Sequence, residues 1–225
     1  MKRKLRYRPS VENEMLFLNK SRKAPNPAKE QANKQNLSPV SREEAEDAVR
    51  VILRYIGEDI SRPGLLDTPG RVVRAWEEWC EGYKQSPTET LDTTFEDIRD
   101  YDQPVIMRDI DFISHCEHHM AAMPGRAHIA YWPDEKIVGI SKLARIVDVF
   151  AKRLQSQENM TREIAEAIEA TLKPKGVAVL ITAAHGCMTT RGAEKPNAML
   201  TTQFFTGKFK ADTALQNQIL GALKG

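Results

Sequence analysis

Two short runs of metal-binding residue types constrain this chain more than any other feature of its sequence. Residues 114–119, Ser-His-Cys-Glu-His-His, hold one thiol, three imidazoles and a carboxylate, and residues 184–187, Ala-His-Gly-Cys, add an imidazole and a thiol. Cys116 and His119 have the Cys-x-x-His spacing at which a tight turn directs sulfur and nitrogen to one ion. Residues two apart in an extended strand face the same side, so His185 and Cys187 are expected to point into one space. The fold must therefore bring the two runs together around a soft metal ion.

Three of these side chains, Cys116, His119 and Cys187, are good zinc ligands, and His118 and His185 remain spare. A structural zinc site is usually closed by four protein ligands, whereas a catalytic site keeps three and leaves a position for water. The number of ligands therefore favours a catalytic site with Zn²⁺ as its cofactor. The alternative interpretation is a core in which two buried thiols and a satisfied histidine cluster pack together, since free cysteine is often simply buried.

Length, charge and cysteine content limit the class of protein. The chain has 225 residues, 41% of them hydrophobic, a net charge of +2 and three widely spaced cysteines. Such cysteines beside histidines indicate metal binding in a reducing compartment rather than a disulfide framework. No apolar run approaches the roughly 20 residues of a membrane span, and the basic start lacks the apolar stretch of a secretory signal. The sequence predicts a soluble, cytoplasmic protein with no membrane partner and no nucleic acid bound through its overall charge.

The amino-terminal part is expected to comprise an arm and a helical portion. Residues 1–37 are polar and interrupted by prolines, a composition typical of a mobile arm. The basic start of the arm suits contact with a nucleic acid or a partner, although a solvated tail without a role is the simpler interpretation. Residues 38–100 are predicted to be helical, because Ser41 and Glu44 form a capping box and Pro69 stands in the first turn of a second helix.

Residues 101–225 are predicted to form an α+β catalytic domain. Four strands are expected, at residues 105–113, 125–132, 177–183 and 198–209. Ser141 and Thr161 are expected to cap two helices between the second and third strands, and Asp212 to open a short last helix. Because sequential strands usually lie side by side, this order predicts an antiparallel four-stranded sheet with two helices on one face, ββααββ.

Four motifs in this domain closely resemble the GTP cyclohydrolase I family. Their order and spacing agree over about residues 40–210, and residues 67–72 upstream are similar to the family's helical region. Each motif alone is modest evidence, but together they are highly specific. The motifs are Cys116-Glu117-His118-His119, Gly139-Ile140-Ser141-Lys142, Gln155-Ser156-Gln157-Glu158, and His185-Gly186-Cys187 followed by Arg191-Gly192.

The resemblance implies a tunnelling fold preceded by a helical portion, in which the sheets of several subunits join edge to edge into a barrel. It implies a homo-oligomer, usually a toroidal homodecamer built as a dimer of pentamers. The implied substrate is GTP, which water and zinc convert into 7,8-dihydroneopterin triphosphate and formate by opening the imidazole ring of guanine. The sequence leaves open the number of subunits, any allosteric regulator, and whether folate, biopterin or a modified tRNA base is made from the product.

The resemblance also implies a role for each matching residue. The zinc ligands would be Cys116, His119 and Cys187, and the acid–base residues would be His118 and His185. The guanine would be held by Glu158, helped by Ser141 and Gln157. The ribose and triphosphate would meet Lys142, Arg145, Arg191 and, from a neighbouring subunit, Arg71. Without the resemblance, Lys142 and Arg145 are more simply interpreted as the solvated face of a helix.

Two other functions compete at this stage. The first is another tunnelling-fold enzyme that acts on a pterin or a deazapurine, although Gln157, Glu158 and Arg191 together favour a nucleoside triphosphate. The second is a zinc-stabilised binding module whose basic arm contacts nucleic acid. That module needs a fourth protein ligand, for which His115 and His185 are the plausible residues.

Overall fold

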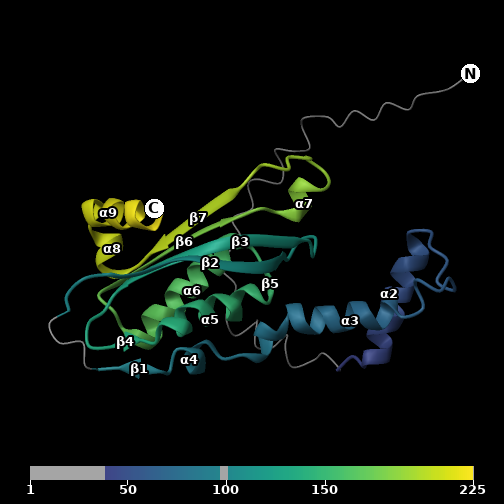
Figure 1. The fold of residues 1–225 in the computed structure, drawn as a ribbon, viewed down its shortest axis with the longest axis horizontal. Helices are drawn as coiled ribbons and strands as arrows, with labels where there is room; N and C mark the ends of the chain where they lie inside the picture. Colours follow the sequence, from purple (N-terminus) through teal and green to yellow (C-terminus); the bar gives the residue numbers. More distant parts are fainter. Residues whose placement is uncertain (1–38, 97–100, 225) are drawn as a thin grey trace, which may run out of the picture.

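The computed structural model describes residues 39–96 and 101–224, so the predicted arm at residues 1–37 lies outside the described part (Figure 1). The described chain starts with a helical hairpin made of α2 (Arg42–Tyr55) and α3 (Thr68–Trp79). The hydroxyl of Ser41 accepts from the backbone N–H of Glu44 at 3.2 Å, and the Glu44 carboxylate accepts from the backbone N–H of Ser41 at 2.8 Å. The predicted capping box is therefore confirmed, as is Pro69 in the first turn of α3.

A short connecting segment follows α3 along the edge of the molecule. It comprises η2 (Glu81–Lys84), α4 (Pro87–Thr90) and β1 (Thr94–Phe95), which pairs with β4 (Ile137–Val138) in a small separate sheet. Helix α2 has no buried residue, and Figure 1 shows it away from the main sheet, at the far end of α3. Within the described residues, no helix is both long enough and apolar enough to cross a membrane.

The main sheet has five strands in the order β5-β2-β3-β6-β7. Its long antiparallel strands are β2 (Val105–Cys116), β3 (Ala122–Trp132), β6 (Gly176–Ala183) and β7 (Leu200–Phe205). The predicted antiparallel four-stranded sheet is thus confirmed. The additional strand β5 (Leu154–Gln155) pairs in parallel with the end of β2, and Gln155 lies opposite Cys116. This pairing fixes the end of β2 that carries the first predicted metal ligand.

Two helices between β3 and β6 cover one face of the sheet (Figure 1). They are α5 (Ile140–Ala151) and α6 (Gln157–Leu172), and their apolar faces pack with β2, β3 and β6 in the main core. The predicted ββααββ arrangement is confirmed. A smaller cluster on other strand residues includes Phe209 of α8 (Gly207–Ala211) and Leu223 of α9 (Thr213–Lys224).

The structure corrects three predicted boundaries. Helix α5 begins after Gly139, and Ser141 lies in its first turn without a capping bond. Helix α6 is capped by Ser156, whose hydroxyl accepts from the N–H of Asn159 at 3.3 Å, so Thr161 lies inside the helix rather than at its cap. The last strand ends at Phe205 because Gly207, with φ of 50°, turns the chain into α8. A Cβ at this glycine would stand 2.3 Å from the carbonyl oxygen of Lys175, so only glycine permits the turn.

Candidate metal centre and substrate site

The first pair of predicted ligands lies in the turn between β2 and β3. The N–H of Cys116 donates to the carbonyl oxygen of Ala121 at 2.9 Å, and the N–H of Met120 donates to the carbonyl oxygen of Cys116 at 2.7 Å. Met120 adopts a left-handed conformation with φ of 54°. The Cys-x-x-His spacing therefore forms the tight turn that the sequence predicts, and it holds Cys116 and His119 at one end of the sheet.

The second segment, residues 184–187, also lies at this end of the sheet, but its conformation differs from the extended strand that the sequence predicts. Strand β6 ends at Ala183, and Cys187 lies in the short helix α7 (Gly186–Thr189), so His185 and Cys187 do not share the face of a strand. A Cβ on Gly186 would stand 2.8 Å from the carbonyl oxygen of Ala122. The glycine therefore lets α7 approach the start of β3, and this approach brings Cys187 to the turn that holds the other two ligands.

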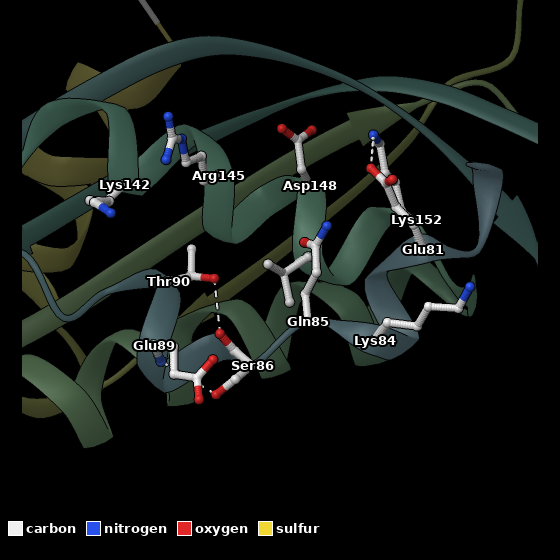
Figure 2. Close-up of a pocket in the computed structure, with 11 residues that line it drawn as sticks. Glu81, Lys84, Gln85, Ser86, Glu89, Thr90, Lys142, Arg145, Asp148 and Lys152 are labelled. Atoms are coloured by element: carbon white, nitrogen blue, oxygen red, sulfur yellow. Dashed lines mark hydrogen bonds and ion pairs between the residues drawn. The ribbon is translucent and has the colours of Figure 1, made fainter. Parts of the chain in front are cut away.

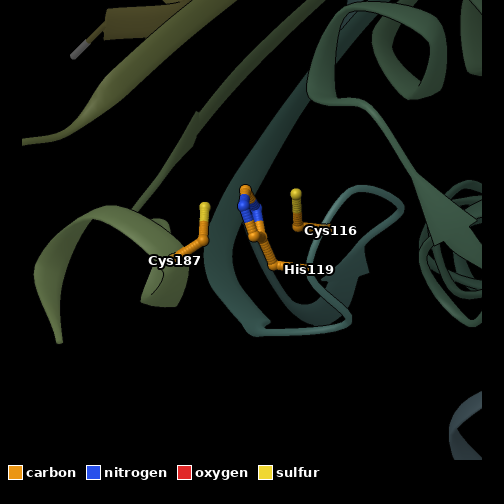
Figure 3. Close-up of side chains that lie close together, drawn as sticks. All are labelled: Cys116, His119 and Cys187. Carbon is orange, nitrogen blue, oxygen red and sulfur yellow. The ribbon is translucent and has the colours of Figure 1, made fainter. Parts of the chain in front are cut away.

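The three predicted ligands form one group (Figure 3). The Cys116 and Cys187 sulfurs and a ring nitrogen of His119 all lie within 4.8 Å of one another. Ligands of a tetrahedral zinc ion stand about 3.5–3.8 Å apart, given Zn–S of about 2.3 Å and Zn–N of about 2.0 Å. A small inward movement of the three side chains therefore brings their ligand atoms to the spacing that zinc requires. The donor set of two thiolates and an imidazole is also one that zinc prefers. Among the described residues, no other histidine, cysteine or carboxylate joins this group.

The surroundings of Cys187 act on the pKa of its thiol in opposite directions. Burial raises the pKa of Cys187, and the neighbouring Cys116 raises it further, while the positive charge of Arg191 lowers it. The thiolate form of Cys187 is therefore disfavoured beside Cys116, and a bound cation would offset these effects. Cys116 is 5% exposed and Cys187 is half-buried, which leaves the exposed His119 as the ligand on the solvent side.

The two spare imidazoles lie beside this group in different environments. The Nδ1 of His118 stands 3.8 Å from the Cys116 sulfur, and its Nε2 stands 3.6 Å from a carboxylate oxygen of Glu117 on an exposed surface. His185 is half-buried, and its Nε2 lies 2.9 Å from the side-chain oxygen of Gln157. Burial lowers the pKa of His185, and the negative charge of Glu158 partly opposes this effect. The structure thus brings both predicted acid–base residues to the metal group.

All but one of the predicted substrate-binding residues fall into two separate places, and Arg71 lies apart from both on α3. Gln157 and Glu158 open helix α6 next to His185, and the charge of Arg191 acts on Cys187, so these three belong to the metal end of the sheet. Lys142 and Arg145 instead line a pocket of about 470 Å³ between α5 and residues 81–90 (Figure 2). None of the three metal-binding side chains lines this pocket.

The pocket on α5 is strongly polar and of mixed charge. Its lining comprises Glu81, Lys84, Gln85, Ser86, Glu89, Thr90, Lys142, Arg145, Asp148, Val149 and Lys152. Ser141 is exposed beside it at the start of α5. Arg71 lies on the exposed side of α3, where its guanidinium pairs with Asp67 at 3.2 Å. One chain therefore does not bring Ser141, Lys142, Arg145 or Arg71 into contact with the metal group.

His115 has a role that the sequence did not indicate. Its side chain is only 3% exposed and stacks on the ring of Trp79, with centroids 4.7 Å apart, while the ring of Trp76 lies 5.1 Å away. His115 thus packs the end of β2 against α3. It does not belong to the metal group and is not a fourth ligand. The other predicted fourth ligand, His185, does not belong to the group whose ligand atoms lie within 4.8 Å of one another. A closed four-ligand site, which the zinc-stabilised binding module requires, is therefore not formed by these residues.

The fold and this group together define a class of protein, an α+β ββααββ unit that carries a three-ligand Cys-His-Cys site for a metal ion. The family model described as GTP cyclohydrolase I matches residues 45–224. GTP cyclohydrolase 1 of Maricaulis maris is 51% identical over 184 residues, which cover 82% of this chain and 90% of that relative. GTP cyclohydrolase 1 of Bartonella henselae is 55% identical over 174 residues, which cover 77% of this chain and 84% of that relative. This chain belongs to the GTP cyclohydrolase I family, as the four motifs predicted.

A solved structure titled "Crystal structure of the archaeosine synthase QueF-Like in the apo form" also overlaps part of the chain. Its TM-score is 0.39 at 15% identity, over 46% of this chain and 93% of that one.

Proposed function

We propose that this protein catalyses the hydrolytic opening of the guanine imidazole ring of GTP, with release of formate and rearrangement to 7,8-dihydroneopterin triphosphate. The observation that carries this proposal is the Cys116, His119 and Cys187 group with two non-ligand imidazoles beside it. A site with three protein ligands leaves a position free, which is typical of catalytic rather than structural zinc. Membership of the family agrees with this activity.

The metal that we propose is zinc, held by Cys116, His119 and Cys187. When bound, zinc supplies Lewis-acid activation of water, which attack on carbon 8 of guanine requires at neutral pH. Ring opening, loss of formate, rearrangement of the ribose and ring closure all move protons. We assign this proton transfer to His118 and His185, because imidazole exchanges protons near neutral pH.

We propose that Glu158 recognises the guanine. Its carboxylate is exposed in the first turn of α6, near the positive end of the helix dipole. An ionised carboxylate can accept from both the ring N–H and the exocyclic amine of guanine. We assign contact with the ribose or the phosphates to Arg191, because its positive charge acts on Cys187 of the metal group.

We further propose that more than one chain completes the active site. Lys142 and Arg145 suit the triphosphate, but in one chain they line a pocket that the metal-binding side chains do not reach. An assembly in which one chain's α5 faces another chain's metal group would unite the two halves, which is consistent with the predicted homodecamer. The boundary that we propose between the helical portion and the catalytic domain lies near residue 100, and the arm at residues 1–37 lies outside the described residues.

The decisive experiment is incubation of the purified, zinc-loaded protein with GTP and analysis of the products by mass. Dihydroneopterin triphosphate and formate in equal amounts are expected, and unchanged GTP would refute the proposed activity. A shared site is tested by co-expression of the Cys187→Ser and Lys142→Ala variants, each of which is expected to be inactive alone. Mixed oligomers should recover part of the activity, since some sites receive both intact halves. If mixed oligomers stay as inactive as either variant alone, each chain holds its own complete site.

A further inference from the structure

We infer that Gln157 is a positioning residue that fixes the orientation and the tautomer of the His185 ring, and that it does not contact the guanine. This inference rests on the proposed function, because it concerns how His185 is prepared for proton transfer. Gln157 is the first residue of α6 and is only 1% exposed. Its side chain has no open surface with which to meet a ligand, and its amide is instead occupied by groups of the protein.

The partners of this amide determine which end is nitrogen. One end lies 3.1 Å from the carbonyl oxygen of Ile181, 3.1 Å from the carbonyl oxygen of Leu200 and 3.0 Å from the hydroxyl of Thr202. Two of these partners are backbone carbonyls, which only accept hydrogen bonds, so the atom that faces them must be the NH₂ group. The reversed amide would place a buried oxygen against two other oxygens. The end that faces His185 is therefore the amide oxygen.

Two threonine hydroxyls support the same orientation. The hydroxyl of Thr161 donates to the main-chain oxygen of Gln157 at 2.7 Å, so this hydroxyl is no longer free to donate elsewhere. The Thr161 and Thr202 oxygens are 2.6 Å apart, so Thr202 must donate to Thr161. The oxygen of Thr202 is then left to accept from the Gln157 amide. The two hydrogens of the NH₂ group serve three oxygen acceptors, and the amide cannot reverse without losing these bonds.

The orientation of the amide determines the tautomer of His185. The Nε2 of His185 lies 2.9 Å from an oxygen that can only accept, so in the neutral ring Nε2 carries the proton. The lone pair then resides on Nδ1, and Nδ1 is the atom that takes a proton from the reacting molecule and returns it. Gln157 holds the ring during both transfers. A positioned acid–base residue typically contributes about 100- to 10,000-fold to a rate, and loss of its positioning partner should remove part of that contribution.

The inference is tested by kinetics on Gln157→Met, which removes both polar ends of the side chain while keeping its length. We expect kcat for GTP to fall about 10- to 100-fold, with KM within about twofold and zinc content unchanged. A rise in KM with unchanged kcat would instead mean that Gln157 reads the substrate, as the family resemblance implies, and would overturn the inference.

A second comparison separates positioning from a general loss of structure. In the His185→Ala background, Gln157→Met should cause no further loss of kcat, because its effect passes through the missing imidazole. Gln155→Met is the matched control, since Gln155 is also a buried amide but donates to Phe150 and Glu163 instead. Gln155→Met should lower kcat by the same factor with and without His185→Ala. If Gln157→Met also lowers kcat by the same factor in both backgrounds, its role is merely structural and the inference is overturned.

The tautomer is measured directly, without GTP, by NMR correlation of ring nitrogens and hydrogens in protein labelled with ¹⁵N-histidine. The His185→Ala variant identifies the signal of His185. We expect the neutral ring to carry its proton on Nε2 in the wild type, and Gln157→Met to shift the signal toward the other tautomer. A wild-type proton on Nδ1 would overturn the inference even if GTP is turned over, whereas the expected tautomer without turnover would refute only the proposed function.

Discussion

Replacement of Gly125 by alanine tests how the sheet holds the two halves of the metal group in place. Gly125 lies in β3 between β2 and β6, and its φ is not positive, so alanine is compatible with its backbone. The new Cβ would nevertheless stand 2.6 Å from the Cβ of Ala183, 2.7 Å from the ring of Phe112 and 2.7 Å from the carbonyl oxygen of Thr182. These contacts come from both neighbouring strands, so no single side chain can relieve them.

The expected loss of stability follows from two opposing contributions. Overpacking lowers the free energy of unfolding by about 1–3 kcal/mol. Alanine also reduces the conformational entropy of the unfolded chain, which raises the free energy of unfolding by about 0.4–1 kcal/mol. The net loss is then about 0–2.6 kcal/mol, and each kcal/mol lowers Tm by about 2–4 °C in a chain of this length. Because β2 continues to Cys116 and β6 leads to Cys187, we also expect weaker zinc binding in competition with a chelator.

Gly221→Ala is the matched control. Gly221 lies in α9, and a Cβ there would meet nothing within 4 Å. In a helix interior, alanine is more stable than glycine by about 1 kcal/mol, so Tm should rise and zinc affinity should not change. The reasoning is refuted if Gly125→Ala raises Tm as much as Gly221→Ala, or if both variants bind zinc with wild-type affinity.

Three further predictions concern the metal, the base and a distant ion pair. Cys116→Ser or Cys187→Ser should lose zinc and activity together; full activity in either metal-free variant contradicts the ligand assignment. In the wild type we expect kcat/KM to fall in the order GTP, inosine triphosphate, adenosine triphosphate. Glu158→Gln should reduce kcat/KM most for GTP and so weaken this preference, because an amide offers one acceptor and one donor in place of two acceptors. An unchanged ranking means that another group recognises the base. The pKa of Asp102 is lowered by its hydrogen bonds to Lys175 and Trp132. Asp102→Asn should therefore lower Tm by its full amount above about pH 3.9, the pKa of Asp in the unfolded chain, and the Tm difference should vanish as the pH falls through the lower pKa of Asp102 in the folded protein. A Tm difference that persists below pH 2 contradicts this assignment.

Local patterns in the sequence were sufficient to predict the order of the elements and the metal ligands. The capping box at Ser41, the buried run at residues 177–183 and the Cys-x-x-His turn each depend on neighbouring residues, and each is confirmed. The group formed by Cys116, His119 and Cys187 could be proposed because few other residue types bind zinc well. The roles assigned to the substrate-binding residues remain predictions.

Features that depend on contacts between distant segments could not be predicted in the same way. Helix α6 starts at Gln157 because Ser156 caps it, whereas the periodicity of its apolar residues becomes clear only from Thr161 onward. The approach of α7 requires Gly186 beside Ala122, a contact that no spacing reveals. The environment of Gln157 likewise depends on β6 and β7, which follow it in the chain.

The contacts of His115 with two indoles give this protein an intrinsic fluorescent probe. Two of its three tryptophans, Trp76 and Trp79, contact the residue that directly precedes Cys116. The third, Trp132, lies at the other end of β3, against Phe209 and the ammonium groups of Lys175 and Lys208. Intrinsic fluorescence excited at the indole band should therefore report loading of the metal centre through the first pair. A Trp132→Phe variant would remove the distant emitter and leave a signal that comes from the hairpin and the metal end alone.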